Sequence, residues 1–244
     1  QQFCGWVRVG HRPAENTLSV TVSESLLPVL PEVLARIKNL FDLYCEPKAV
    51  YETLQVMNTL QPGLCVLGTR LPGCFNVFEM SVRAVLGQQI TVKAASTLAA
   101  RLVAVYGTQV QTGIEGLTHS FPAPAAILAL GENISEHLGK LGIISARANT
   151  IYQLARVLAD EKNDFGFCGN PEEEMQKLQA IRGIGSWTAQ YIAMRAMGWP
   201  DAFLPTDAGI KKALPDHTPK ELQVLSEAWR PWRSYATVNL WNTL

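Results

Sequence analysis

The stretch LQAIRGIGSWTAQYIAMRAMGWPDAFLPTDAGIKKAL, residues 178–214, decides the fold of this chain. Within it, Gly183 and Gly185 supply the backbone freedom that a tight connection between two helices requires. Ser186 follows them as a good N-cap for the second of these helices. Residues 178–197 therefore predict a helix–hairpin–helix.

The predicted bend, Arg182-Gly183-Ile184-Gly185-Ser186, suits the binding of a phosphate group. Bare amides at the start of a helix, with the positive end of the helix dipole behind them, can grip a phosphate oxygen. Arg182 would add a positive charge. An ordinary helical hairpin, in which the glycines only satisfy the turn, fits the glycine spacing equally well.

A loop rich in glycine and proline follows the second helix and ends at Asp207, directly before a helix predicted over residues 208–214. A hairpin, such a loop and an aspartate in this order resemble the signature of the helix–hairpin–helix DNA glycosylase superfamily. The detail resembles its 3-methyladenine DNA glycosylase II (AlkA-type) branch. Two further segments resemble that branch, VRAVLGQQI at residues 82–90 and WRPWRSYA at residues 229–236. The resemblance runs from about residue 75 to the end of the sequence.

The resemblance implies a mainly α fold, α+β overall, with helical domains and a small N-terminal antiparallel β/α domain. Alternating apolar residues predict a β-hairpin over residues 5–22, an apolar stripe predicts a helix over residues 28–43, and everything after the Pro/Gly-rich boundary is predicted to be helical. We expect the ends to be trimmed, with an edge strand of the sheet missing. The predicted divisions are an N-terminal domain (1–60), a boundary segment (61–77), a helical domain with the hairpin (78–199) and a C-terminal helical part with the aspartate loop (200–244).

Asp207 is the expected catalytic residue, because one carboxylate beneath the sugar would stabilise the positive charge that develops as the glycosidic bond stretches. It is also expected to be a helix N-cap. Asp201 falls too early in the loop to match the motif. Lys211 and Lys212 are expected at the surface or facing phosphate.

Three aromatic residues, Trp187, Tyr191 and Trp241, are the expected base pocket. Trp187 and Tyr191 lie four apart on one helix face, and Trp241 matches a family position. Alkylated purines such as 3-methyladenine and 7-methylguanine carry positive charge, which an aromatic pocket attracts by about 1–2 kcal/mol. Core packing is the other interpretation of these side chains.

The residue at position 187 also bears on the type of reaction. In superfamily members that cleave the DNA strand, the corresponding residue is a lysine that forms a Schiff base with the sugar. Trp187 has no amine. The resemblance therefore implies a monofunctional glycosylase that leaves an abasic site.

The loop at Gln88, Gln89 and Ile90 is the expected minor-groove wedge. Spacing alone favours a plain turn between two helices, whereas the resemblance implies that the loop enters the minor groove and fills the gap left by the extruded nucleotide. Gln88 would then contact the duplex and Gln89 would sit at the wedge position. The family usually has a bulky apolar residue there, so either Gln89 or Ile90 could fill the gap.

Composition limits the other possibilities. The chain has 244 residues with 21 basic and 21 acidic side chains, so its formal charge is zero and a broad non-specific coat on DNA is not expected. The five scattered cysteines, Cys4, Cys45, Cys65, Cys74 and Cys168, are predicted to be reduced and mostly buried thiols. They lack the spacing of an iron–sulfur cluster.

The expected protein is an intracellular, cytoplasmic monomer of bacterial type that binds double-stranded DNA containing alkylated bases and has no membrane segment and no cofactor. The resemblance also implies a monovalent cation on hairpin carbonyls. Two alternatives stay open: a non-catalytic DNA-binding module that uses the hairpin alone, and a glycosylase for oxidised or mismatched bases.

Overall fold

The computed structural model describes residues 3–159 and 170–244, and it is mainly helical. The order of the elements confirms the predicted fold class, with one small antiparallel hairpin at the N-terminus followed by helices. The polar composition of residues 160–170 predicts an exposed loop, and this stretch lies outside the described residues except for Asn170. None of the helices in the described ranges combines the length and apolar character that crossing a bilayer requires.

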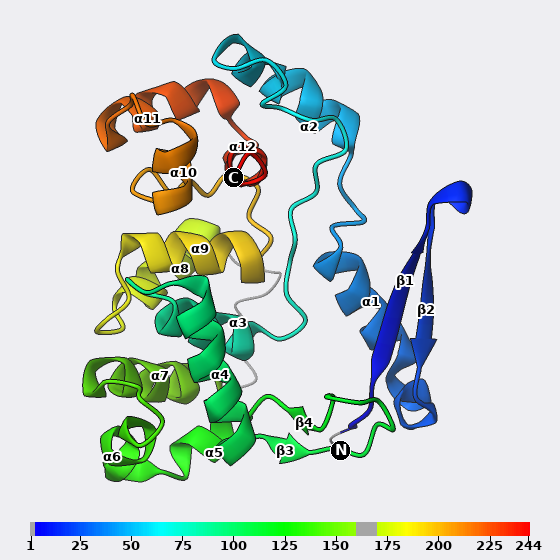
Figure 1. The fold of residues 1–244 in the computed structure, drawn as a ribbon, viewed down its shortest axis with the longest axis vertical. Coiled ribbons are helices and arrows are strands. Elements are labelled where there is room, and N and C mark those ends of the chain that lie inside the picture. Colours follow the sequence, from blue (N-terminus) through cyan, green and yellow to red (C-terminus); the bar gives the residue numbers. More distant parts are fainter. Residues whose placement is uncertain (1–2, 160–169) are drawn as a thin grey trace.

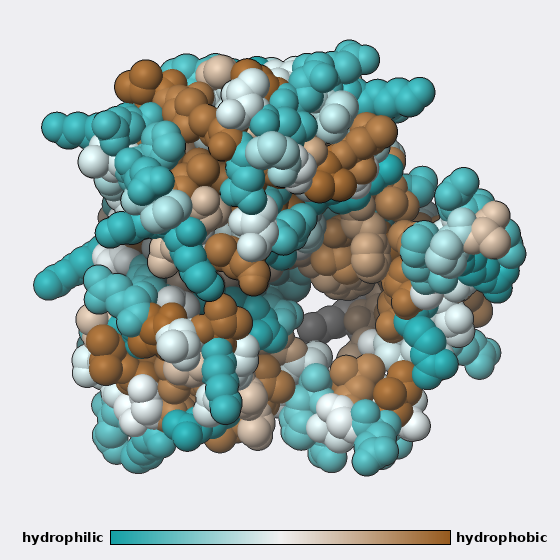
Figure 2. Space-filling view, turned by 45° about the horizontal axis from the view of Figure 1, so that its top comes forward, coloured by the Kyte–Doolittle hydropathy of each residue, from teal (hydrophilic) through white to brown (hydrophobic). Residues whose placement is uncertain are grey.

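The N-terminal part begins with the predicted β-hairpin. Strands β1 (Val7–Arg12) and β2 (Thr17–Val22) pair antiparallel, and the left-handed Asn16 closes the turn between them with φ of 50°. Their inner faces pack with Leu26, Val33 and Ile37 into a small core of their own. On the face drawn in Figure 2, a hollow separates the lobe that carries this hairpin, at the right, from the helical body.

The helix predicted over residues 28–43 is shorter than expected. A 3-10 segment (Glu24–Val29) precedes α1 (Leu30–Leu40), and Asp42 leaves the helical conformation with φ of 53°. Helix α2 (Pro47–Leu54) and a 3-10 turn (Gln55–Thr59) follow. The chain then runs in an extended path from α2 to α3, which Figure 1 shows as the long cyan segment.

The helical body consists of α3 (Val77–Leu86), α4 (Val92–Tyr106), α5 (Pro124–Leu128), α6 (Ile134–Gly139), α7 (Ser145–Leu158), α8 (Pro171–Gln179) and α9 (Ser186–Ala196). The prediction of helix throughout this region is wrong at one place. Strands β3 (Thr108–Gln109) and β4 (His119–Ser120) form a short antiparallel pair after α4. Their turn is built on Gly113 and Gly116, both at positive φ, which helices do not accommodate.

The C-terminal part consists of α10 (Ala208–Ala213), α11 (Pro219–Leu225), a 3-10 turn (Ser226–Trp229) and α12 (Arg233–Trp241). The sequence predicts that the final helix begins near Pro231, and α12 starts two residues later, at Arg233. These elements enclose a second large core, around Trp229, that also takes in residues of α2.

Helix α9 is the element between the two large cores. Its Ala189, Ile192 and Ala193 are fully buried in the core of the helical body, whereas Met194 is buried in the C-terminal core. Figure 1 shows α9 lying between the layer of α10–α12 above and the helices α3–α8 below. Side chains on the rest of α9 therefore lie at the junction of the two layers.

Candidate active site

Asp207 is the N-cap of α10, as predicted. Its Oδ1 accepts hydrogen bonds from the backbone N–H of Gly209 at 2.9 Å and of Ile210 at 3.1 Å. These bonds satisfy two amides that have no partner within the helix. The side chain is only 9% exposed, so the surrounding groups hold its orientation.

Two indole groups also donate to this carboxylate. Nε1 of Trp187, on α9, donates to Asp207 Oδ2 at 3.1 Å, and Nε1 of Trp241, on α12, donates to Oδ1 at 2.8 Å. Asp207 therefore joins three elements, α9, α10 and α12. Oδ1 accepts three bonds and Oδ2 accepts one, so Oδ2 keeps the freer lone pairs.

The aromatic rings of the predicted base pocket lie next to the carboxylate. Trp187 and Tyr191 are stacked with centroids 5.2 Å apart and planes 7° apart, and Tyr191 and Trp241 are tilted by 50° at 6.4 Å. All three rings are half-buried, and they pack against the edge of the C-terminal core. The structure thus brings the four predicted residues of the site together, although they are up to 54 positions apart in the chain (241 minus 187).

Arg195 is a neighbour of this cluster that sequence reasoning missed. Its guanidinium lies 5.7 Å from the centroid of the Tyr191 ring, and its Nη1 donates to the Tyr191 hydroxyl at 3.3 Å. Its Nε donates to the carbonyl of Pro72 at 2.6 Å, which ties α9 to the extended segment. The sequence offered one indication of this contact: Arg195 follows Tyr191 by four residues, which places the two side chains on the same face of a helix.

Asp201, the less likely substitute for Asp207 as the catalytic residue, is held by two arginines. Arg233 grips it through Nε to Oδ1 at 2.7 Å and Nη2 to Oδ2 at 3.0 Å, and Arg230 also donates to Oδ2. Arg233 Nη2 further donates to the Asp201 carbonyl at 2.8 Å. Both carboxylate oxygens of Asp201 are therefore occupied by guanidinium groups.

The loop that carries Asp207 is also bound to α12 through Ser234. The Ser234 hydroxyl donates to the carbonyl of Trp199 at 2.7 Å, and the Ser234 amide donates to the carbonyl of Pro200 at 2.8 Å. Because α12 also carries Trp241, this attachment fixes the position of the Asp207 carboxylate relative to the Trp241 indole.

The hairpin between α8 and α9 has the predicted shape with one correction. Helix α9 starts at Ser186, and Gly185 is its N-cap, so the prediction of Ser186 as N-cap is wrong. A residue already in helical conformation cannot turn its hydroxyl back to the free amides of the first turn. Gly183 has φ of 96°, which favours glycine.

The hairpin presents its backbone to solvent. Arg182, Gly183, Gly185 and Ser186 are exposed, whereas Ile184 is 4% exposed and anchors the bend in the core. A Cβ at Gly185 would have open space around it. As far as residues 3–159 and 170–244 are concerned, the backbone at the start of α9 is therefore open to solvent.

The predicted wedge residues lie in the turn between α3 and α4. Gln89 is exposed and has φ of 55°, and Ile90 is half-buried. Gln88 is half-buried, and its amide donates to the hairpin: to the carbonyl of Gly183 at 2.9 Å and to the hydroxyl of Thr188 at 3.0 Å. Gln89 is thus the side chain that the turn presents most openly, and contact of Gln88 with a duplex stays a prediction.

Other candidate groups lie away from this cluster. Lys211 and Lys212 are exposed on α10. Of the cysteines, Cys65 is buried, Cys45 and Cys74 are intermediate and Cys4 is exposed, so the prediction of mostly buried thiols is wrong for the described residues; Cys168 lies outside them. Within residues 3–159 and 170–244, no group of three or more His, Cys, Asp or Glu is placed to hold a metal ion.

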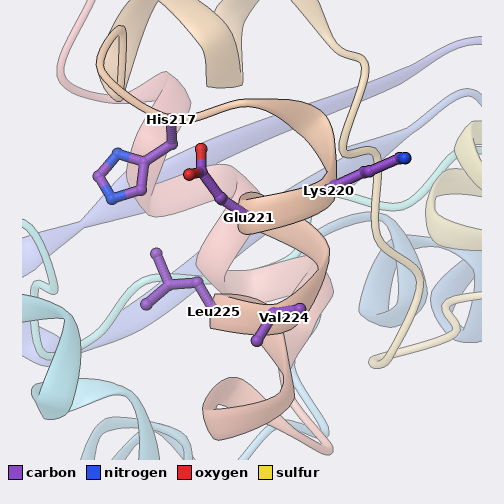
Figure 3. A pocket seen from close by; sticks show the side chains of 5 residues that line it. All are labelled: His217, Lys220, Glu221, Val224 and Leu225. Carbon is purple, nitrogen blue, oxygen red and sulfur yellow. The ribbon is translucent and has the colours of Figure 1, made fainter.

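A shallow apolar groove runs beside α11. It is lined by His217, Lys220, Glu221, Val224 and Leu225, as Figure 3 shows. None of the residues predicted for the site lines it. The carboxylate and aromatic cluster therefore remains the candidate active site.

A helical hairpin with exposed amides, a following Gly/Pro loop and a capping aspartate beside aromatic rings define the helix–hairpin–helix glycosylase class of fold. Comparison with known families agrees, since residues 82–233 match the HhH-GPD superfamily of base excision DNA repair proteins and residues 1–76 match the AlkA N-terminal domain. The chain belongs to the HhH-GPD superfamily, on the branch that carries the AlkA N-terminal domain.

Its curated relatives include bacterial proteins named as DNA repair enzymes. The chain is 38% identical to DNA-3-methyladenine glycosylase 2 of Escherichia coli K12, over 94% of this chain and 78% of the relative. It is 40% identical to a probable bifunctional transcriptional activator/DNA repair enzyme AlkA of Mycobacterium tuberculosis, over 86% of this chain and 42% of that protein.

A solved structure shares the fold. The 3-methyladenine DNA-glycosylase from Archaeoglobus fulgidus aligns with a TM-score of 0.76 at 22% identity, over 96% of this chain and 81% of that chain. At this identity the likeness concerns the fold alone.

Proposed function

We propose that the protein is a monofunctional DNA glycosylase that extrudes alkylated purines from double-stranded DNA and hydrolyses their glycosidic bond, leaving an abasic site in base excision repair. The observation that carries the proposal is the Asp207 carboxylate, held by the indole N–H groups of Trp187 and Trp241 beside the Tyr191 ring. Membership of the HhH-GPD superfamily and the similarity to glycosylases over most of the chain support it.

Asp207 would act electrostatically. A purine such as 3-methyladenine or 7-methylguanine leaves readily because it is already cationic, and the sugar gains oxocarbenium character as the bond stretches. A fixed carboxylate stabilises that charge without reorganisation. Its Oδ2 accepts only one hydrogen bond and has lone pairs available for the sugar or for the attacking water.

The aromatic cluster would select the damaged base. Trp187, Tyr191 and Trp241 are half-buried, so part of each ring is open to a base. Their electron-rich faces attract a cationic purine over a normal one. The positive charge of Arg195 at Tyr191 opposes this attraction, so we propose that the base stacks nearer to the two tryptophans.

The hairpin between α8 and α9 and the turn between α3 and α4 would bind the duplex. Exposed amides at the start of α9 suit a phosphate oxygen, and the exposed Gln89 suits insertion beside the extruded nucleotide. Carbonyl oxygens of the hairpin are suitable ligands for a Na⁺ or K⁺ ion, although those of Arg182 and Gly183 already accept bonds from Thr150 and Gln88. A carbonyl oxygen that accepts one hydrogen bond keeps a second lone pair, so carbonyls of this bend would hold the ion, and no other cofactor is proposed.

The absence of strand cleavage is part of the proposal. Position 187 carries an indole whose N–H faces Asp207, and an indole cannot form a Schiff base with the sugar. We further propose that the chain acts as a monomer, inside the cell, where its DNA substrate is.

The test is release of methylated bases from alkylated duplex DNA by the native protein and by Asp207→Asn. Asn retains a capping oxygen, so the fold should persist, whereas loss of the charge should slow release by at least about a hundredfold. Strands should stay intact until alkali is added, and borohydride should trap no covalent complex.

Each of the other outcomes would indicate a different function. No release by the folded native chain would favour the non-catalytic DNA-binding module. Release of oxidised or mismatched bases in preference to methylated ones would favour the other glycosylase. A trapped Schiff base would contradict the monofunctional assignment.

A further inference from the structure

The wedge loop (residues 87–90) and the hairpin (residues 182–186) are joined by one side chain. Nε2 of Gln88 donates one hydrogen bond to the carbonyl of Gly183 at 2.9 Å and another to the hydroxyl of Thr188 at 3.0 Å. A carboxamide nitrogen has two protons, and both are used here. The side chain of Gln88 therefore lies between the two loops, which are about a hundred positions apart in the sequence.

Helix α7 holds both loops from a second side. Arg147 donates from Nη2 to the carbonyl of Gln88, and Thr150 donates from its hydroxyl to the carbonyl of Arg182 at 2.9 Å. The two residues are three apart, so they lie on one face of the helix. One turn of α7 therefore contacts the main chain of both loops.

The fit at this junction is tight. A Cβ on Gly183 would come within 2.1 Å of the Thr150 hydroxyl, so the hairpin lies directly against α7. Next to Gln88, Gln89 is held at φ of 55°, a conformation that costs a side-chain-bearing residue energy. Such a conformation persists when the surrounding contacts fix it. Here the hydrogen bonds that the Gln88 side chain donates, and the one that its carbonyl accepts from Arg147, supply those contacts.

We infer that Gln88 is a positioning residue: with Arg147 and Thr150 it locks the wedge loop and the hairpin at one fixed spacing before DNA arrives. The tip at Gln89 then enters the duplex at the step set by the phosphate that the hairpin grips. Loops that are ordered in advance lose less conformational entropy on binding. The inference rests on the proposed function, because it takes both loops to bind DNA.

The experiment compares Gln88→Met, which keeps the length of the side chain without its amide, with Thr188→Val and the double variant. The probe is a duplex with a tetrahydrofuran abasic site and 2-aminopurine opposite it. Anisotropy gives the affinity, and 2-aminopurine fluorescence reports entry of the wedge. No base is excised, so the measurement does not depend on catalysis.

Gln88→Met should weaken binding about tenfold and reduce the fluorescence change, since it removes the hydrogen bonds from the wedge loop to Gly183 in the hairpin and to Thr188 in α9. Thr188→Val should have a smaller effect in the same direction. The double variant should bind like Gln88→Met alone, because both substitutions remove one shared bond. Thr188→Ser keeps the hydroxyl and should behave like the native protein.

Native-like binding and fluorescence of Gln88→Met would overturn the inference, as would additive losses in the double variant. Gln55→Met, on the exposed surface next to α2, is the matched control and should change nothing. If Gln88→Met does not fold, the contrast between Thr188→Val and Thr188→Ser decides, and equal binding by those two would overturn it. Failure of the glycosylase proposal would appear separately: the protein would release no base, while the binding of these variants would still show that the two loops are coupled.

Discussion

At the residue scale, the candidate site depends on the hydrogen bonds that two indole groups donate to one carboxylate. Trp187 and Trp241 each donate an N–H to Asp207, and in the proposed pocket each would also offer an aromatic face to a base. Ring and donor can be separated by substitution, because phenylalanine keeps an aromatic face and lacks the donor.

We expect Trp241→Phe to slow single-turnover release of methylated bases by about tenfold to a hundredfold, the equivalent of one hydrogen bond to a charged group. Affinity for a duplex with an abasic-site analogue should change little, since most of the ring remains. Trp187→Phe should behave alike, with a smaller effect because its bond is longer (3.1 Å against 2.8 Å). Unchanged rates in both variants would show that the indole donors do not orient Asp207.

The two hairpin glycines should respond differently to alanine. At Gly183, φ of 96° and the contact with Thr150 should make Gly183→Ala lower the unfolding free energy by about 1–3 kcal/mol, measured by denaturant titration. Gly185→Ala meets no atom within 4 Å, so it should keep the native stability while crowding the approach to the amides and weakening DNA binding. Equal stability of the two variants would contradict this account.

At the element scale, the loop between α9 and α10 is positioned by α12. Asp201 near its start is clamped by Arg233, whose side chain is only 7% exposed. Asp207 at its end reaches Trp241 on the same helix. The loop that carries Asp207 is therefore attached to α12 at both ends.

Arg233→Met should lower the unfolding free energy by about 3–5 kcal/mol, because it leaves Asp201 buried without its main partner. Arg230→Gln should cost less than about 1 kcal/mol, since the Arg230 side chain is 48% exposed. Thermal or denaturant unfolding of the two variants provides the comparison. A large loss for Arg230→Gln with a small one for Arg233→Met would reverse the assignment of the principal partner.

At the scale of the whole molecule, the N-terminal part is attached to α12 through partly buried hydrogen bonds. The Tyr235 hydroxyl donates to Asp42 Oδ2 at 3.0 Å, and the amide of Leu71 donates to the same oxygen at 2.9 Å. Burial raises the pKa of Tyr235, so this donor keeps its proton at all ordinary pH values. Tyr235→Phe should lower the unfolding free energy by about 1–3 kcal/mol, because it leaves an acceptor of Asp42 without its hydroxyl donor.

The neutral net charge makes a prediction about DNA binding as a whole. The chain carries 21 basic and 21 acidic residues, so few phosphates should be neutralised. The slope of log K against log salt concentration should correspond to about four phosphates or fewer, on the scale of −0.9 per phosphate. Anisotropy titrations between about 50 and 200 mM salt test it, and a slope typical of a basic DNA-binding domain would contradict it.

Several parts of the fold were predictable because their signals are local. Glycine spacing located the hairpin, alternation located β1 and β2, and the position of Asp207 before a helix predicted its N-cap. Ser186 was misassigned because the helix boundary depends on one residue's backbone angles. The β3–β4 pair was missed because two-residue strands carry no periodicity.

By itself, the sequence determined the fold class and the hairpin and named the candidate carboxylate and aromatic side chains, because these follow from residue types at short spacing and from motifs that resemble those of a known family. Only the tertiary structure decided that Trp187 and Trp241 donate to Asp207, that Asp201 belongs to Arg233 and that Gln88 joins the two loops. Those contacts link positions 20 to 95 residues apart. The packing of whole helices determines which residues form these contacts, and this packing cannot be read from the spacing of residues along the chain.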